Sequence, residues 1–184
     1  MIFSLLGQAL VGWLIADLIG GFVHWWEDRI GRPRWAWLER HVFEPNRHHH
    51  AEPMAFTEQG FLSRNSTAFL AATVIAIIWL SVFGFSTVLL FAFLGGAFQN
   101  EVHYLAHKRP GGSKTHKPGR FAGWLSVFQQ IGLIQSVPGH AKHHLPPQNK
   151  NYCVLTDWCN PVLEYLDVWN RLERLLNIKD QENG

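Results

Sequence analysis

The feature that most constrains the fold of this chain is a long run without a single charged residue, from Asn65 to Asn100. One helix that crosses a bilayer needs about 20 apolar residues, so the run is nearly long enough for two. Gly84 lies near its middle, where a tight turn can join two helices. The run therefore predicts a helical hairpin through a membrane, with a buried hairpin in a soluble core as the open alternative.

The N-terminal stretch Ile2–Trp26 is also apolar, apart from Asp17. No basic residue precedes it, so we expect a retained membrane helix and not a cleaved signal peptide. The stretch Phe121–Val137 is apolar but is interrupted by three glutamines. Because these amides fit poorly in hydrocarbon, an interfacial or re-entrant helix is favoured there over a full crossing.

Near the C-terminus, apolar residues recur at steps of three and four between Pro161 and Leu176, which predicts an amphipathic helix with Asn160 as its N-cap. Together the segments predict an all-α fold, an integral-membrane bundle of three to four membrane helices. The 184 residues suffice for one domain, 1–184. The net charge of +2 gives no reason to expect a nucleic-acid partner.

The positions of the basic residues predict how the helices are oriented. All sixteen Lys and Arg lie within residues 27–64, within 108–120, or after His140. Basic residues accumulate on the cytoplasmic side of a membrane. Ile2–Trp26 should therefore run from outside to inside, and the turn at Gly84 should lie outside. Every histidine then falls in a cluster at the cytoplasmic ends of the multi-pass bundle.

The chain has eleven histidines, and several are spaced as metal ligands. His103 and His107 form HxxxH, so both imidazoles share one helix face. A second box, HxxHH, consists of His140, His143 and His144. His48, His49 and His50 are adjacent, and two of the three can ligate from a loop.

Carboxylates and amides accompany these boxes. His24 and Asp28 form HxxxD, in which Asp28 either ligates or orients an imidazole. Asp17 shares the helix face of His24 but lies about 10 Å away by helix rise, so it can only support the site indirectly. Asn100, one turn before His103, either supports a metal-bound water or satisfies backbone groups within the membrane.

The number of imidazoles bears on the metal. A closed zinc site needs four ligands, and this chain offers about twice that number. HExxH is absent, and imidazole suits Fe, Zn, Cu and Ni. The surplus favours two metal ions, and open imidazole-rich sites favour oxygen chemistry at iron. A histidine-rich metal transporter is an alternative, although its ligands should lie near the bilayer midplane.

Four blocks resemble a known family, the Kua or plasmanylethanolamine desaturases. They are ADLIGGFVHWWED, RHHHAEPMAF, QNEVHYLAH and GHAKHHLPPQNKNYCVLTDWCNP. The last block is also similar to the plastid phosphatidylglycerol desaturases. The resemblance implies a non-haem di-iron lipid desaturase. Its implied metal ligands are His24, His49, His50, His103, His107, His140, His143 and His144, with Asp17, Asp28, Asn100 and His48 as possible supporting residues.

Some positions match nothing in the pattern or depart from it. His41 and His116 are predicted to be ordinary loop histidines. Glu101 replaces an expected Gln, Leu105 an expected Trp, and Asp157 an expected Gly. These departures lie beside the ligands, so they bear on the substrate more than on metal binding.

The resemblance implies the O2-dependent introduction of a double bond into an acyl or 1-O-alkyl chain of a membrane phospholipid, with two Fe per chain. A di-iron lipid hydroxylase is the alternative. The sequence has no GxGxxG, no haem CxxCH and no iron–sulfur cysteine set. Electrons should therefore come from an external donor, cytochrome b5-like or a ferredoxin. Ala92 and Gly96 form a small-xxx-small pair, which favours close helix packing or a lipid tunnel.

Overall fold

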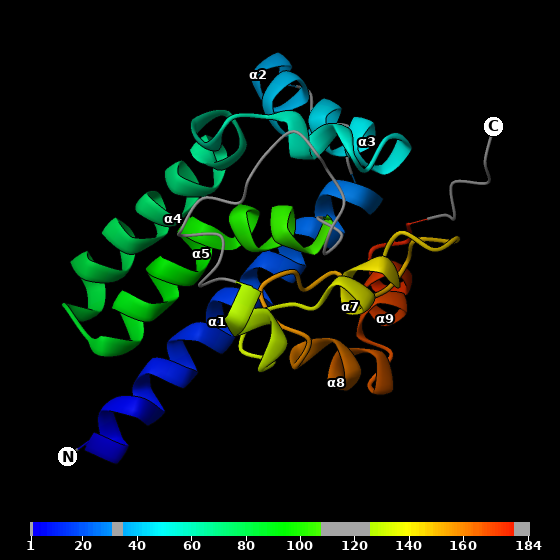
Figure 1. Ribbon diagram of the computed structural model, residues 1–184. Coiled ribbons are helices and arrows are strands. Elements are labelled where there is room, and N and C mark those ends of the chain that lie inside the picture. Colours follow the sequence, from blue (N-terminus) through cyan, green and yellow to red (C-terminus); the bar gives the residue numbers. More distant parts are fainter. Residues whose placement is uncertain (1, 31–34, 108–125, 179–184) are drawn as a thin grey trace.

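The computed structural model describes residues 2–30, 35–107 and 126–178, and these residues form helices and no strand (Figure 1). The long helices are α1 (Ile2–Arg29), α4 (Phe61–Phe83) and α5 (Thr87–His107). The shorter elements are α2 (Ala36–Leu38), the π-helical turn η1 (Glu39–Phe43), α3 (Glu44–Ala51), the 3-10 turn η2 (Ala55–Glu58), α7 (Val137–Ala141), α8 (Cys159–Tyr165) and α9 (Val168–Leu175).

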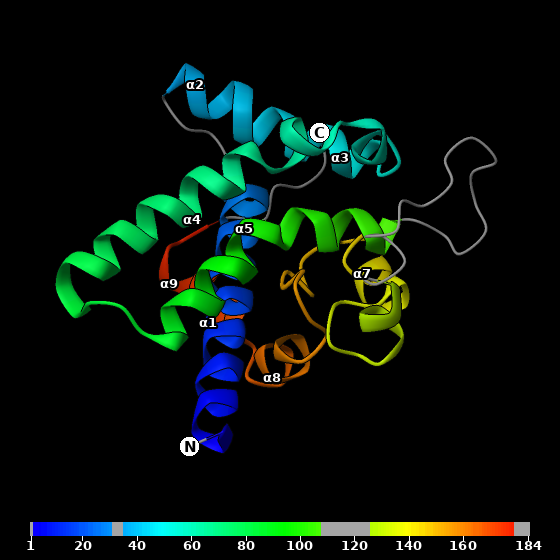
Figure 2. The same cartoon turned by 60° about the vertical axis from the view of Figure 1, so that its left-hand side comes forward.

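The three long helices match the three predicted membrane segments within a few residues. Gly84 joins α4 to α5 with φ of +72°, a left-handed conformation that suits glycine. The N-terminus of α1 and the α4–α5 turn lie toward the same side of the molecule (Figures 1 and 2). Within the described ranges, Ser4–Arg29 and Phe61–Phe83 are long and apolar enough to cross a membrane.

Helix α5 is the centre of the bundle because it packs against both α1 and α4. Two glycines allow α1 and α5 to approach closely. A Cβ added at Gly12 would lie 2.3 Å from the carbonyl oxygen of Val88, and one at Gly95 would lie 2.6 Å from Cβ of Ala16. Such backbone proximity is typical of helix pairs packed through small residues in membranes.

The outer face of α4 is apolar and unpartnered in the described structure. Ile77 is 61% exposed and Val82 is 65% exposed. A soluble monomer rarely exposes a contiguous apolar face of this kind. The surface therefore fits contact with lipid, and it disfavours the alternative of a buried hairpin in a soluble core.

Asp17 fixes the C-terminal half of the chain against α1. Its fully buried carboxylate accepts hydrogen bonds from the backbone N–H groups of Leu155 and Thr156, at 3.0 and 3.1 Å, and from the Thr156 hydroxyl. The sequence had suggested a supporting role at the metal site. In the structure Asp17 anchors the extended segment that follows the HxxHH box.

The predicted fourth segment does not form one long helix in its described part. Residues 121–125 lie outside the described ranges, residues 126–130 are helical, and a turn follows with Gly132 at φ of +75°. Two of the glutamines satisfy backbone carbonyls here: Gln129 donates to Gln135, and Gln135 donates to Cys153. Since His107 and His140 are in contact, the chain between them returns to the same end of the bundle.

The prediction of a single amphipathic helix from Pro161 to Leu176 is wrong, because the helical conformation is interrupted between α8 and α9. Asp167 has φ of +51° and ψ of +39°, a left-handed conformation that ends a right-handed helix. Its carboxylate accepts hydrogen bonds from Asn170 and Arg174 of α9. The predicted N-cap is also wrong, since the Asn160 side chain bonds both backbone groups of Cys153.

Replacing Asp17 with Ala tests this anchor. The change leaves two buried backbone N–H groups without an acceptor, so we expect a loss of about 2–5 kcal/mol in the free energy of unfolding. Asp17→Asn keeps an acceptor and should lose less. Denaturation in detergent measures both, and equal stability of Asp17→Ala and wild type would contradict the assigned role.

Candidate metal centre

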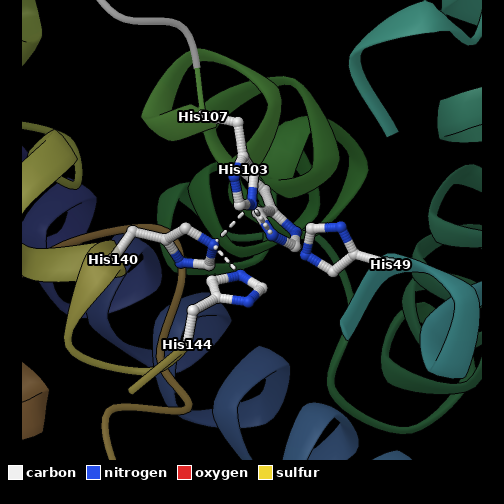
Figure 3. A group of neighbouring side chains, drawn as sticks. All are labelled: His49, His103, His107, His140 and His144. Carbon is white, nitrogen blue, oxygen red and sulfur yellow. Dashed lines mark hydrogen bonds between the residues drawn. The ribbon is translucent and has the colours of Figure 1, made fainter. Parts of the chain in front are cut away.

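Five imidazoles from four parts of the chain converge at one point, and we call them the five-histidine group (Figure 3). One ligand nitrogen of each lies within 4.8 Å of those of the others. Helix α5 supplies two of them through the predicted HxxxH box, and α7 with the turn after it supplies two more. The members are His49 of α3, His103, His107, His140 and His144.

The Nε2 atoms in this group lie at the distances of neighbouring ligands on one metal ion. They are 3.1 Å apart between His103 and His107, 2.7 Å between His107 and His140, and 3.0 Å between His140 and His144. Two nitrogens at about 2.1 Å from one metal lie about 3.0–3.4 Å apart for angles between 90° and the tetrahedral value. The separations of 3.1 and 3.0 Å therefore fit one metal ion, and the 2.7 Å between His107 and His140 is slightly shorter than this range.

Hydrogen bonding alone does not account for this arrangement. A neutral imidazole has one N–H donor, yet Nε2 of His107 and Nε2 of His140 each face two other ring nitrogens. Both nitrogens of His49 are buried and have no hydrogen-bond partner. Burial lowers the pKa of His49 and His140 far below the ordinary value, and that of His144 to about 3. The rings are thus neutral and offer lone pairs to a shared cation.

A second set of side chains, the aspartate group, lies beside the first. It consists of His24, Asp28, His50 and His143. Asp28 lies at its centre: Oδ1 is 3.0 Å from Nε2 of His50, and Oδ2 is 3.4 Å from Nε2 of His143. Oδ2 and Nε2 of His24 are both buried without a hydrogen bond. These atoms fit a second metal ion, with Asp28 as a candidate ligand.

Backbone carbonyls orient two rings of the aspartate group. Nδ1 of His24 lies 3.1 Å from the carbonyl oxygen of Tyr152, and Nδ1 of His143 lies 2.9 Å from that of Lys150. A carbonyl can only accept, so Nδ1 carries the proton and Nε2 is left as the ligand atom. No sequence pattern indicated this contribution of residues 150–152, because a backbone carbonyl is present at every position.

The two groups are contiguous. The ring centroids of His24 and His103 lie 6.0 Å apart, and those of His50 and His144 lie 5.3 Å apart. His49 and His50 follow each other on α3, so each group receives one of them. Two metal ions held here would lie close enough to act on one substrate together.

A cavity of about 610 Å³ reaches both groups from the space between α1, α4 and the α2–α3 segment. His24, His49 and His103 form part of its wall. Other parts of the wall are polar or basic, including Arg40 and Asn100. We call this cavity the metal cleft.

The remaining predicted supporting residues lie outside the two groups. Asn100 donates a hydrogen bond to the carbonyl oxygen of Arg64 at 2.8 Å. This contact agrees with the second of its two predicted roles, that of satisfying backbone groups within the membrane. Asn100 also lines the metal cleft. His48 is exposed. His41 is exposed and packs on Trp37, while His116 lies outside the described residues.

Two of the three departures from the family pattern have visible structural roles. Glu101 accepts from Arg64 at 2.7 Å in a buried ion pair, and Arg64 also stacks over the ring of Tyr104. Asp157 accepts from the backbone N–H of Ser136, at the start of α7. Glu101 holds α5 and Asp157 holds the start of α7, and both helices carry candidate ligands. Neither carboxylate belongs to the five-histidine group or to the aspartate group.

In this structure, apolar helices end in buried groups of convergent imidazoles. This combination defines the class of the protein, a helical membrane protein with a candidate histidine-rich metal centre. Residues 13–182 match the lipid desaturase domain family. The chain belongs to this family, which confirms the resemblance found in the sequence. No solved structure matches the chain.

Three relatives illustrate the family. Plasmanylethanolamine desaturase of Myxococcus xanthus is 31% identical over 179 residues, 94% of this chain and 60% of that protein. Mouse plasmanylethanolamine desaturase 1 is 26% identical over 180 residues, 91% of this chain and 63% of that protein. Chloroplastic fatty acid desaturase 4-like 2 of Arabidopsis thaliana is 31% identical over 182 residues, 96% of this chain and 60% of that protein. The chain thus spans under two thirds of each relative.

Adjacent histidines provide a matched test of the site. His49→Ala removes a ring from the five-histidine group, so the purified protein should lose bound metal and activity while its helix content is retained. His48→Ala should retain both, because the His48 side chain is exposed. Elemental analysis and circular dichroism measure the outcomes. Equal metal loss in both variants would indicate a general effect on folding and would contradict the assignment of His49 as a metal ligand.

Proposed function

We propose that this protein is an O2-dependent desaturase that introduces a double bond into a hydrocarbon chain of a membrane phospholipid, acyl or 1-O-alkyl. The observation that carries the proposal is the pair of contiguous ligand groups, with eight imidazoles and one carboxylate, at the end of an apolar helical bundle. Family membership supports the same reaction class.

The proposed metal is iron, two ions per chain. When bound, a pair of iron ions supplies the oxidising power to break unactivated C–H bonds, which side-chain acids and bases lack. The five-histidine group would hold one ion through neutral donors only. The aspartate group would hold the other, and its Asp28 carboxylate lowers the net positive charge on that side.

The proposed reaction balances as follows. Two C–H bonds on neighbouring carbons break and a C=C bond forms, which releases two electrons and two protons from the lipid. O2 takes these together with two further electrons and two protons and becomes two molecules of water. The further electrons must come from a separate one-electron carrier, a cytochrome b5-like protein or a ferredoxin.

The chain's own residues would position the lipid. The polar part of the metal cleft, with Arg40 and Asn100, suits a phospholipid head group, and His24 and His103 lie in the same wall. A head group held there brings the carbons nearest the glycerol to the metal centre. We therefore propose that the double bond forms within a few carbons of the glycerol.

The protein is a membrane protein by its family and its two apolar helices. We further propose that α1, α4 and α5 all cross the bilayer and that the metal centre lies at the cytoplasmic face. Lys and Arg are absent from the first sixteen residues and from the Gly84 turn, which supports this orientation.

The orientation can be tested by labelling single cysteines with a membrane-impermeant maleimide, in a Cys159→Ser background. Phe85→Cys, beside the turn, should react in intact cells. Lys150→Cys, beside the metal centre, should react only after the membrane is opened. Both positions are exposed in the structure, so a missing reaction reports the membrane and not burial. Labelling of both in intact cells would contradict the proposed topology.

The function itself is tested with iron-loaded protein, an electron donor, and phospholipids that carry either a saturated acyl or a saturated 1-O-alkyl chain. We expect a product lighter by two hydrogens, formed only in air and absent with His49→Ala. A product heavier by one oxygen would instead identify a hydroxylase. Failure of a folded, iron-loaded enzyme to change either lipid would overturn the proposal.

A further inference from the structure

A second, narrower cavity of about 90 Å³ runs between α1, α4 and α5, and we call it the apolar slot. It adjoins the metal cleft, because the two share part of their walls. The shared residues are Gly20, Val23, Ala68, Ala71 and Gln99. The slot therefore lies next to the cavity that reaches the candidate metal centre.

Small side chains form much of the wall of the slot. Ala72 and Ala76 of α4 and Ala92 and Gly96 of α5 line it where these two helices pack together, and Ile15 and Ile19 of α1 line it from the other side. A Cβ added at Gly96 would lie 3.5 Å from Cβ of Ala72, so the two helices are already in ordinary contact there. The small-xxx-small pair therefore serves close packing and also lines the slot.

The length and shape of the slot point to its occupant. Along α4 it extends from Ala68 to Trp79, about 16 Å at the rise of an α-helix. Trp79 and Leu89 are the bulky residues at the end away from the histidines. A space that is long, thin and apolar fits an unbranched saturated chain and excludes rings and polar groups.

Gln99 marks the junction of the two cavities. It lies one turn of α5 before His103, and a Cβ added at Gly20 would lie 2.3 Å from its Oε1 atom. The amide therefore lies over Gly20 where the metal cleft gives way to the slot. A chain that runs from the metal cleft into the slot would pass this amide, on the face of α5 that also carries His103.

A larger apolar cavity, about 570 Å³, lies between α1 and α5 and the turn around Leu133. Among the described residues no histidine lines it, and none of its lining residues also lines the metal cleft. The slot is the better candidate because five of its lining residues also line the metal cleft, whose wall includes His24 and His103.

We propose that the apolar slot holds the methyl end of the lipid chain being oxidised, and that Trp79 with Leu89 sets the longest chain accepted. This inference rests on the proposed function, since the oxidised chain must pass the metal centre. It goes beyond that function because it assigns the selection of chain length to residues about four helical turns away from His103, counted along α5 from Leu89.

The first experiment compares Ala76→Phe with Ile77→Phe. Ala76 lines the slot, whereas its neighbour Ile77 is 61% exposed on the outer face of α4. Ala76→Phe should lower kcat/KM for long saturated chains about tenfold or more while sparing short ones. Ile77→Phe should leave the chain-length profile and the iron content of the enzyme unchanged. Trp79→Ala should shift the profile toward longer chains, which keeps the proposal testable if Ala76→Phe folds poorly. Unchanged profiles in Ala76→Phe and Trp79→Ala would overturn it.

The second experiment needs no turnover and so separates this inference from the function. A phospholipid with a photoreactive diazirine at the end of one saturated chain is bound to the purified protein and irradiated. Labelled residues identified by mass spectrometry should include Trp79 or Phe93, with loss of labelling in Ala76→Phe but not in Ile77→Phe. Labels confined to Ile77 and Ile78 would refute the slot, even in an active desaturase. Slot labelling in a protein without desaturase activity would instead refute the proposed function alone.

Discussion

The structure depends on holding eight imidazoles and one carboxylate together in a largely buried space. Ring nitrogens about 3 Å apart, with their lone pairs turned toward one another, do not stabilise a fold by themselves. The rest of the chain must hold them in place until a cation can bind. The long helices, the anchored C-terminal segment and the short helix α3 each supply ligands to this point.

Buried ion pairs and hydrogen bonds hold the ligand-bearing elements in place. Glu173 of α9 binds Arg29 of α1 through two contacts, at 2.7 and 2.9 Å, and also accepts from Trp25. At the other side, Arg64 and Glu101 connect α4 to α5 one turn from the ligands. Asp17 holds the segment that carries the carbonyls of Lys150 and Tyr152 near their histidines. These polar contacts are costly to leave unpaired in a membrane, so they fix one arrangement of the helices.

The same helices connect the metal centre to two kinds of space. The metal cleft is partly polar and opens among α2, η1 and α3, while the apolar slot is lined by membrane helices. A phospholipid has the same division between a polar head and an apolar chain. His24 and His103 of the candidate metal centre lie in the wall of the metal cleft, which adjoins the slot, and this arrangement supports the proposed oxidation near the glycerol.

The sequence by itself determined the three long helices, the turn at Gly84 and most of the ligand candidates. These are local properties: charge-free length, glycine conformation, and histidines three or four apart on one helix. The sequence did not determine how the histidines divide into two groups, because His49 and His50 are neighbours that turn to different partners. It did not reveal that Asp17 binds the segment after the HxxHH box, and it predicted one helix where the structure has α8 and α9. Only the tertiary structure decided these points, since each depends on contacts between residues distant in sequence, such as Asp17 with Thr156 and His24 with the carbonyl of Tyr152.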